Sequence, residues 1–240
     1  MSASTAQPPR NAISKEMARI TREFYGKGPA RTRTFVIDTV IFSVLDDVLT
    51  PVEAALKDGG RSDLVRRVRL SFQDTMAQTF TDAVEQLTGA RVVAYHSQIL
   101  FDPDLAVEIF VLDRPIGPAT AAGTGLGQVR SAVSDAIVGL LRESWGKGPT
   151  GARVYIEEPF VFCVLEDVLT TVERTLVEGG ESDLVRELRM EFHTLEHAGF
   201  AERVEAATGR EVLTSHSQIV FDPDLLFMVF VLADHPAGGR

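Results

Sequence analysis

HSQILFDPDL, residues 96–105, returns as HSQIVFDPDL at residues 216–225, and this repetition decides how the 240-residue chain is organised. Other matches share the same offset of 120 residues: GKGP at 26–29 and 146–149, DVLT at 47–50 and 167–170, and SDLVR at 62–66 and 182–186. Between positions 11 and 115, 46 of 105 residues are identical to the residue 120 further on, without a gap. A period this long indicates a duplicated domain, because the units of solenoid repeats run from about 20 to 50 residues.

A connector separates the two copies. Residues 114–128, RPIGPATAAGTGLGQ, are rich in Gly, Pro, Ala and Thr and show neither helical nor strand periodicity. The expected division is a disordered tail at 1–10, copy 1 at 11–113, the connector at 114–128, copy 2 at 129–234 and a tail at 235–240.

The composition is that of a globular protein, with 45% hydrophobic and 24% charged residues. The sequence has neither the run of about 18 apolar residues that a membrane span needs nor a signal peptide, so we expect a cytoplasmic protein without direct membrane insertion. It could still lie peripherally on the inner face of the membrane. The net charge of −10 argues against nucleic acid as a partner. Cys163 is the only cysteine, so one chain can form neither a disulfide nor a thiolate metal site.

The first half of each copy predicts a helix, a β-hairpin and a short capped helix. In copy 1 the apolar residues at 13, 17, 20 and 24 fall on one helical stripe, which ends at Gly26. Two strands at 33–37 and 40–45 follow, joined by a turn at Asp38-Thr39, where copy 2 has Glu158-Pro159. Thr50 and Glu53 have the spacing of a capping box, so a short helix is expected to begin there.

The second half predicts a long helix and a second strand pair. Ser62 is expected to cap a helix that runs to about residue 87, and copy 2 should repeat it. Strands at 92–100 and 105–112 are expected to join across Asp102-Pro103-Asp104, because Asp and Pro favour turns. The order in each copy is therefore α-β-β-α-α-β-β.

This order predicts an α+β fold, in which a four-stranded, mostly antiparallel sheet carries helices on one face. Both alternating sets of residues 225–232 are apolar, so the other face of the sheet should be covered as well. The economical cover is the sheet of the other copy, with the two copies paired about a pseudo-twofold axis. Alternatively, a helix of the other copy or a second molecule covers this face.

The segments kept in both copies resemble the MpsC-like family of small bacterial proteins, which includes the YbcI-like domain of unknown function. The matching features are an aromatic-G-K-G-P turn at 25–29 and 145–149, Arg33 and Arg153, V-L-T-x-V-E at 48–53 and 168–173, and the H-S strands at 96 and 216. The resemblance implies a non-enzymatic accessory or regulatory module associated with a membrane cation or inorganic-carbon transport system. Its expected partners are membrane transport subunits or further copies of itself. Most members of this family have one copy, where this chain has two.

The GKGP loops could bind an oxyanion through Lys27 and Lys147. A P-loop, however, follows a strand and precedes a helix, whereas this loop leaves a helix and enters a strand. A helix stop with an exposed lysine is therefore the preferred interpretation.

His96 and His216 are the histidines kept in both copies. Each precedes a serine, but neighbouring residues on a strand point to opposite faces, so the two do not form a catalytic dyad. They are either core or interface residues or, if the copies pair, ligands that meet across the axis. Together with Arg33, Arg153, Lys27 and Lys147 they are the candidate ligand-binding residues.

The sequence predicts no catalytic residue, metal site or cofactor. The alternative to an accessory module is a small-molecule or metal-binding sensor, or an enzyme, with its site at the junction of the two copies.

Overall fold

The computed structural model describes residues 9–116 and 126–234. The chain divides into two compact units, Met1–Ala121 and Ala122–Arg240, which contain copy 1 and copy 2. The first helix begins at Arg10 and the helix that opens copy 2 begins at Gly127. The central part of the expected connector and nearly all of both expected tails lie outside the described residues.

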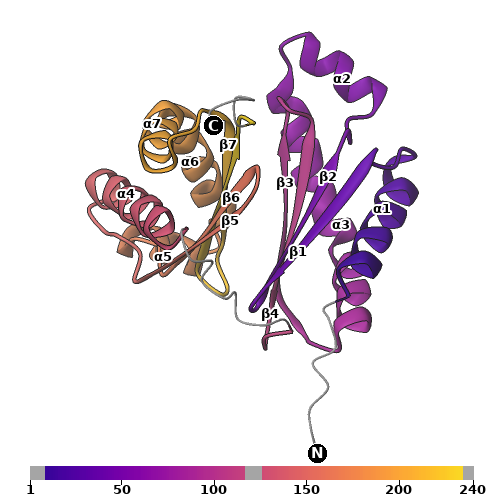
Figure 1. The fold of residues 1–240 in the computed structure, drawn as a ribbon, viewed down its shortest axis with the longest axis horizontal. Helices are drawn as coiled ribbons and strands as arrows, with labels where there is room; N and C mark the ends of the chain where they lie inside the picture. The colour runs from indigo at the N-terminus through magenta and orange to yellow at the C-terminus, as the bar shows by residue number, and fades with distance from the viewer. Residues whose placement is uncertain (1–8, 117–125, 235–240) are drawn as a thin grey trace, which may run out of the picture. The chain divides into compact units, whose positions relative to one another are not determined.

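Copy 1 has the element order that its sequence predicts (Figure 1). The elements are α1 (Arg10–Tyr25), β1 (Arg31–Ile37), β2 (Val40–Asp46), α2 (Pro51–Asp58), α3 (Ser62–Thr88), β3 (Val92–Leu100) and β4 (Leu105–Leu112). Copy 2 consists of α4 (Gly127–Trp145), β5 (Gly151–Glu157), β6 (Phe160–Glu166), α5 (Thr171–Glu178), α6 (Ser182–Leu195), α7 (His197–Thr208), β7 (Val212–Val220) and β8 (Leu225–Leu232).

Each copy contains one four-stranded antiparallel sheet. The strand order is β1-β2-β4-β3 in copy 1 and β5-β6-β8-β7 in copy 2, so the last strand of each copy lies inside its sheet. In copy 1 the register places Ile109 opposite both Phe42 and His96. The expected α+β fold is therefore confirmed for both copies.

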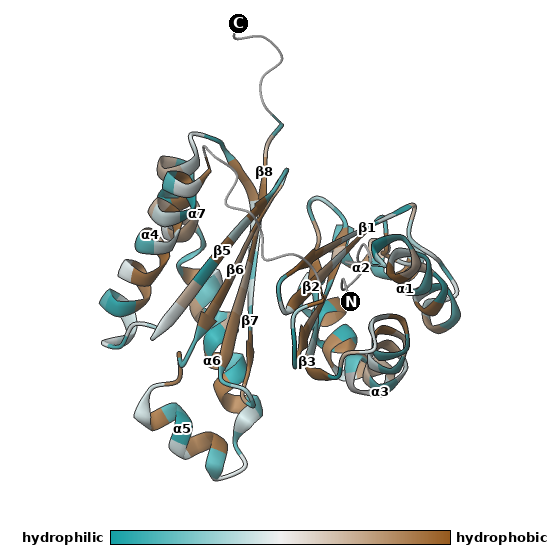
Figure 2. Ribbon diagram, turned by 60° about the horizontal axis from the view of Figure 1, so that its bottom comes forward, coloured by the Kyte–Doolittle hydropathy of each residue, from teal (hydrophilic) through white to brown (hydrophobic). Residues whose placement is uncertain are grey.

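One face of each sheet packs against the helices. In copy 1, Ile41 and Phe110 from the sheet share a buried cluster with Met17 of α1 and Phe80 of α3. In copy 2 the corresponding cluster joins strands β6 and β8 to α4, α6 and α7. Figure 2 shows the strands as predominantly apolar, and burying one large apolar side chain contributes roughly 1.5–3 kcal/mol.

The central strands are also buried at their other set of alternating positions. All eight residues of β4 and all eight of β8 are buried, as the doubly apolar pattern indicated. The expectation that the two sheets cover each other about a pseudo-twofold axis stays a prediction.

Local signals in the sequence placed most element ends correctly. Gly26 adopts a left-handed conformation with φ of 71°, which would strain a residue with a side chain. Its N–H donates to the carbonyl of Arg22 at the end of α1. Thr50 with Glu53 and Thr170 with Glu173 form complete capping boxes. The prediction for Ser62 is wrong: it is the first helical residue, and Arg61 precedes it without a side-chain cap.

The long helix differs between the copies. Copy 1 has a single helix, α3, whereas copy 2 has α6 and α7, separated at Glu196. The N–H of Glu196 still donates to the carbonyl of Phe192, so the interruption is local. Gly199 replaces the Thr79 of copy 1, and a Cβ there would lie 3.2 Å from Glu196 Oε2 and at an ordinary contact distance of 3.5 Å from Leu140 of α4. The expectation of one long helix in copy 2 is therefore corrected.

Candidate functional site

The lysine of each GKGP loop binds a neighbouring loop of its own copy. Lys27 Nζ donates to Asp47 Oδ1 and to the carbonyl of Leu49, both at 2.8 Å. Lys147 repeats these bonds to Asp167 at 2.9 Å and to Leu169 at 2.8 Å. The loop lies between a helix and a strand in both copies, as the sequence indicated, so it is not a P-loop.

The second aspartate of the DPD turn holds the same loop from the other side. Asp104 accepts hydrogen bonds from the N–H groups of Val48 and Leu49 at 3.1 Å. In copy 2, Asp224 accepts from the N–H groups of Val168 and Leu169 at 3.0 and 3.2 Å. The turn aspartate therefore replaces the hydrogen bonds that this loop would otherwise need from water.

A part-buried ion pair completes this arrangement in copy 1. Arg69 of α3 donates to both carboxylate oxygens of Glu53, at 2.6 and 2.7 Å, and to the carbonyl of Val48 at 3.0 Å. Its guanidinium lies 3.9 Å from the ring centroid of Tyr25. Burial works to raise the pKa of Glu53, but the hydrogen bonds from Arg69 and Thr50 outweigh it and hold this pKa below its usual value.

Copy 2 contains the same ion pair. Arg189 bonds Glu173 at 2.6 Å through two nitrogens and lies 4.0 Å from the ring centroid of Trp145. We call these residues the motif cluster: Lys27, Asp47, Glu53, Arg69 and Asp104 in copy 1, and Lys147, Asp167, Glu173, Arg189 and Asp224 in copy 2. In both copies the motif cluster ties the end of the first helix, the capped helix, the long helix and the last turn together.

His96 lies on the outer strand β3, beside Gln73 of α3. The Gln73 amide nitrogen is 3.1 Å from His96 Nδ1, and the Gln73 amide oxygen accepts from the N–H of Ser97 at 3.2 Å. Gln73 thus covers part of the strand edge. Sequence reasoning missed this residue because copy 2 has His193 in its place.

His216 of copy 2 has two further histidines nearby. The His193 ring is 6.0 Å from the ring of His216 and 6.2 Å from that of His197, and His193 Nε2 is 3.2 Å from Ser215 Oγ. The search for repeated residues missed His193 and His197, because neither has a counterpart in copy 1. Within residues 9–116 and 126–234, no three His, Cys, Asp or Glu side chains are arranged to hold a metal ion.

Arg33 and Arg153 each bind a carboxylate on the adjacent strand. Arg33 Nη2 is 2.8 Å from Asp46 Oδ1, and Arg153 Nη2 is 2.7 Å from Glu166 Oε1. Within copy 1, Arg33 and His96 lie on the two opposite edge strands of the sheet, so the fold does not bring these two candidates together.

Copy 1 has a buried carboxyl group that the sequence analysis did not single out. Glu108 lies on β4 at a buried position, where it accepts hydrogen bonds from Tyr95 Oη at 2.7 Å and Ser97 Oγ at 3.1 Å. Burial raises the pKa of Glu108 to about 7, although both hydrogen bonds act in the opposite direction. A carboxyl group with this pKa can take up or release a proton near neutral pH.

The hydroxyl groups of three residues continue from Glu108 toward the edge of the sheet. Ser43 is paired with Glu108 across β2 and β4, its hydroxyl is 3.0 Å from that of Thr34, and Ser14 of α1 donates to Thr34 at 2.8 Å. We call this set the polar row: Ser14, Thr34, Ser43, Tyr95, Ser97 and Glu108. It crosses the helix-covered face of the sheet.

Copy 2 has lost the polar row. Thr34, Ser43 and Glu108 are replaced by Val154, Cys163 and Met228, all of which belong to its hydrophobic cluster. Burial raises the pKa of the Cys163 thiol to about 12, so this group stays protonated. The two copies therefore share one backbone fold and one motif cluster but differ in the chemistry of their cores.

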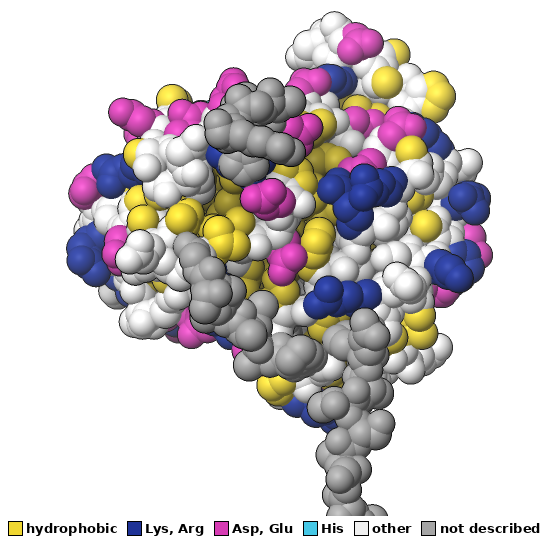
Figure 3. Space-filling view, in the orientation of Figure 1, with side chains coloured by type: hydrophobic (Ala, Val, Ile, Leu, Met, Phe, Trp, Pro, Cys, Tyr) yellow, Lys and Arg dark blue, Asp and Glu magenta, His cyan; other side chains and the backbone are white. Residues whose placement is uncertain are grey.

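On the face drawn in Figure 3, Lys and Arg side chains lie among Asp and Glu side chains. None of the helices within residues 9–116 and 126–234 is both long and apolar enough to cross a bilayer.

The fold and the motif cluster define a class of protein: a tandem pair of α+β domains whose recurrent charged residues stabilise their own loops. The chain belongs to the MpsC family, described as "Na+-translocating membrane potential-generating system (MpsC)", whose sequence pattern matches residues 9–114 and 126–234. The resemblance seen in the sequence is thus confirmed for both copies.

One curated relative is the uncharacterized protein YrhF of Bacillus subtilis (strain 168). It is 33% identical over 101 residues, which are 41% of this chain and 82% of that protein. No solved structure matches the chain.

Proposed function

We propose that this chain is a non-enzymatic accessory or regulatory module of a Na+-translocating, membrane-potential-generating system, and that it acts from the cytoplasmic side of the membrane. The observation that carries the proposal is the match of both copies to a family described by that system. The finer proposal is that the system is a cation or inorganic-carbon transporter and that its membrane subunits are the partners.

The motif cluster supports a binding module rather than an enzyme. Residues kept through a duplication are candidates for catalysis, but here Lys27, Glu53 and Arg69 bind loops and helices of their own copy. Arg33 and Arg153 are likewise engaged with Asp46 and Glu166. The charged residues shared by both copies therefore stabilise the fold, and we place the function on the surface of the molecule.

Co-purification and a physiological measurement test the proposal together. The tagged chain, expressed in its native host at its native level, should recover integral membrane transport subunits from detergent-solubilised membranes. Deleting its gene should lower the Na+-dependent part of the membrane potential, measured with a voltage-sensitive dye in Na+ and in K+ buffers. The wild-type gene should restore that part.

A second variant tests whether function depends on the stability of copy 1. Arg69→Leu should disrupt the motif cluster of copy 1 and should restore neither the potential nor the co-purification, whereas the surface change Glu202→Arg should restore both. An unchanged potential after deletion, together with recovery of soluble proteins alone, would contradict the proposed function.

The alternative, a sensor or enzyme with a site at the junction of the copies, makes a different prediction. His96, His216, Arg33 and Arg153 would then have to bind a ligand or metal. Metal analysis of the purified chain, with a His96→Gln and His216→Gln double variant as control, tests it. Stoichiometric metal that the double variant loses would favour this alternative.

A further inference from the structure

Helix α6 of copy 2 carries exposed leucines on its solvent side. Leu184, Leu188 and Leu195 are 52%, 47% and 80% exposed, and their spacings of four and seven residues place them on one face of the helix. Isolated exposed leucines are common, but a row along one helix face is typical of a contact surface. We call this row the leucine stripe.

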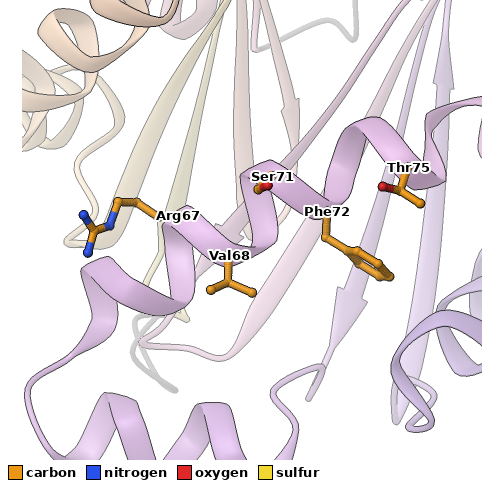
Figure 4. Close-up of a pocket in the computed structure, with 5 residues that line it drawn as sticks. All are labelled: Arg67, Val68, Ser71, Phe72 and Thr75. Carbon is orange, nitrogen blue, oxygen red and sulfur yellow. The ribbon is translucent and has the colours of Figure 1, made fainter.

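Helix α3 of copy 1 has a hollow at the equivalent positions. The hollow has a volume of about 430 Å³ and lies along the solvent side of α3, where Figure 4 draws its lining residues: Arg67, Val68, Ser71, Phe72 and Thr75. Val68 is 55% exposed. An open depression of this kind suits the side chains of a protein partner better than a small molecule, because small-molecule sites enclose most of their ligand.

The charges beside these two surfaces are opposite in sign. Arg61, which precedes α3, and Arg67 of α3 lie on either side of Leu64 and Val68, and both arginines are exposed. At the same positions of copy 2 stand the exposed Glu181 and Glu187, and the exposed Glu191 replaces Ser71. The duplication has therefore kept the backbone and reversed the charge.

We infer that the hollow of α3 in one chain receives the leucine stripe of α6 in a second copy of the same chain. Leu188 and Leu195 then pack on Val68 and Phe72, while Glu187 and Glu191 face Arg67. Opposite charges at the rim of such a contact set its register and exclude the like-charged α3–α3 and α6–α6 pairings. Each chain carries one surface of each kind, so the contact is head-to-tail and builds chains or closed rings.

The contact is expected to be weak. Helix α6 has 14 residues and so spans about 21 Å at about 1.5 Å per residue, and a single helix-on-helix contact falls below the roughly 1,600 Å² of a stable interface. Assembly should therefore appear at high protein concentration and decline at high salt, where the rim charges are screened.

Charge reversal on the full-length chain tests the contact by sedimentation velocity over a range of concentrations. Arg67→Glu puts an acidic side chain opposite Glu187 and Glu191, and Glu187→Arg puts a basic side chain opposite Arg67, so each change should weaken self-association by roughly fivefold or more. The two changes combined in one chain restore opposite charges and should restore assembly. An equimolar mixture of the two single variants should also assemble, because each supplies the surface that the other lacks.

Matched controls carry the same charge changes elsewhere. Lys15→Glu on α1 and Glu202→Arg on α7 are exposed positions outside both surfaces and should leave assembly unchanged. Leu188→Gln should weaken it without altering the circular dichroism spectrum. A wild-type chain that stays monomeric at its highest attainable concentration would overturn the inference, as would a double variant or a mixture that assembles no better than the single variants.

Discussion

Glu108 shows how one residue can give copy 1 a property that copy 2 lacks. Its pKa is raised from 4.5 to about 7, so the folded state binds this proton more tightly than the unfolded chain does. The stability of copy 1 must then fall as pH rises from about 4.5 to about 7, because above that range the folded state holds a buried, ionised carboxylate. The full effect of this shift is about 3 kcal/mol.

Replacing Glu108 with Gln should remove most of this pH dependence. The amide keeps the size of the side chain and an acceptor for Tyr95 but cannot ionise. The charged and phenolic groups that interact with Glu108 keep their protonation state in this range: Arg69 remains charged, Tyr25 has a pKa of about 12, and burial raises the pKa of Tyr95 well above 10. Urea unfolding between pH 5 and pH 8, compared between variant and wild type, measures the difference.

The matched change is Met228→Glu in copy 2. Ser215 stands where copy 1 has Tyr95, so a carboxyl group at 228 would lack the tyrosine hydrogen bond and should destabilise copy 2 by about 2 kcal/mol or more. If the free energies of unfolding of wild type and Glu108→Gln change with pH in the same way, Glu108 does not titrate as proposed.

The motif cluster acts at the scale of elements, because Arg69 joins α3 to the capped end of α2. Arg69→Leu should cost about 2–3 kcal/mol, since it leaves the part-buried Glu53 carboxylate with only its hydrogen bonds from Thr50. The lowered pKa of Glu53 makes stability depend on pH in the opposite sense to Glu108. The stabilisation by Glu53 is present above pH 4.5 and is lost as pH falls through the lower, folded-state pKa.

Acid unfolding of wild type and Arg69→Leu measures both effects. The variant should unfold at lower urea concentration at pH 7, and the gap should narrow as pH falls below about 4.5. Arg67→Leu, two residues away on the exposed side of the same helix, is the control and should change stability by less than about 0.5 kcal/mol. Equal effects of the two changes would mean that the ion pair does not stabilise the fold.

Helix ends provide another prediction at this scale. Gly26 has φ of 71° and open space around its Cα, so Gly26→Ala adds backbone strain without a clash and should cost about 1 kcal/mol. Gly127→Ala also adds a methyl group in open space, but without the left-handed backbone. Gly127→Ala should be neutral or slightly stabilising in thermal unfolding. A similar loss of stability in both variants would mean that backbone strain at residue 26 is not the cause.

The elements were predictable from sequence wherever one local cause decides them. The turn at Asp102-Pro103-Asp104 separated β3 from β4 as observed, and Thr50 with Glu53 fixed the start of α2. The break at Glu196 was not predictable, because no glycine or proline stands at that residue or beside it. The role of Arg69 was also hidden, since its partner Glu53 is 16 residues away and the pair forms only when two helices meet.

The candidate site was less predictable than the fold. A search for residues shared by the copies finds what both need, which is the motif cluster, and passes over what only one has. Such a search therefore missed Glu108 and the charge difference between Arg67 and Glu187. Comparing the copies for differences at buried and exposed positions is the signal that finds such residues.

At the scale of the whole molecule, the second face of each sheet needs a cover. In copy 2, Val161 and Met228 face the helices, so the alternating residues Phe162 and Phe227 belong to the other face. If the sheets of the two copies cover each other, a separately purified copy 2, residues 122–240, exposes this apolar surface. It should bind a hydrophobic dye or self-associate, because soluble monomers rarely expose large apolar patches.

Adding purified copy 1, residues 1–121, should then suppress dye binding and give a one-to-one complex by light scattering. To keep this readout independent of the contact between α3 and the leucine stripe, the copy 1 fragment carries Arg67→Glu or the copy 2 fragment carries Glu187→Gln, and either change weakens that contact. Replacing Phe227 with Lys in copy 2 should abolish both dye binding and complex formation, since a charge on this face opposes its burial. An isolated copy 2 that is monomeric, does not bind the dye and ignores copy 1 would mean that the two sheets do not depend on each other for cover.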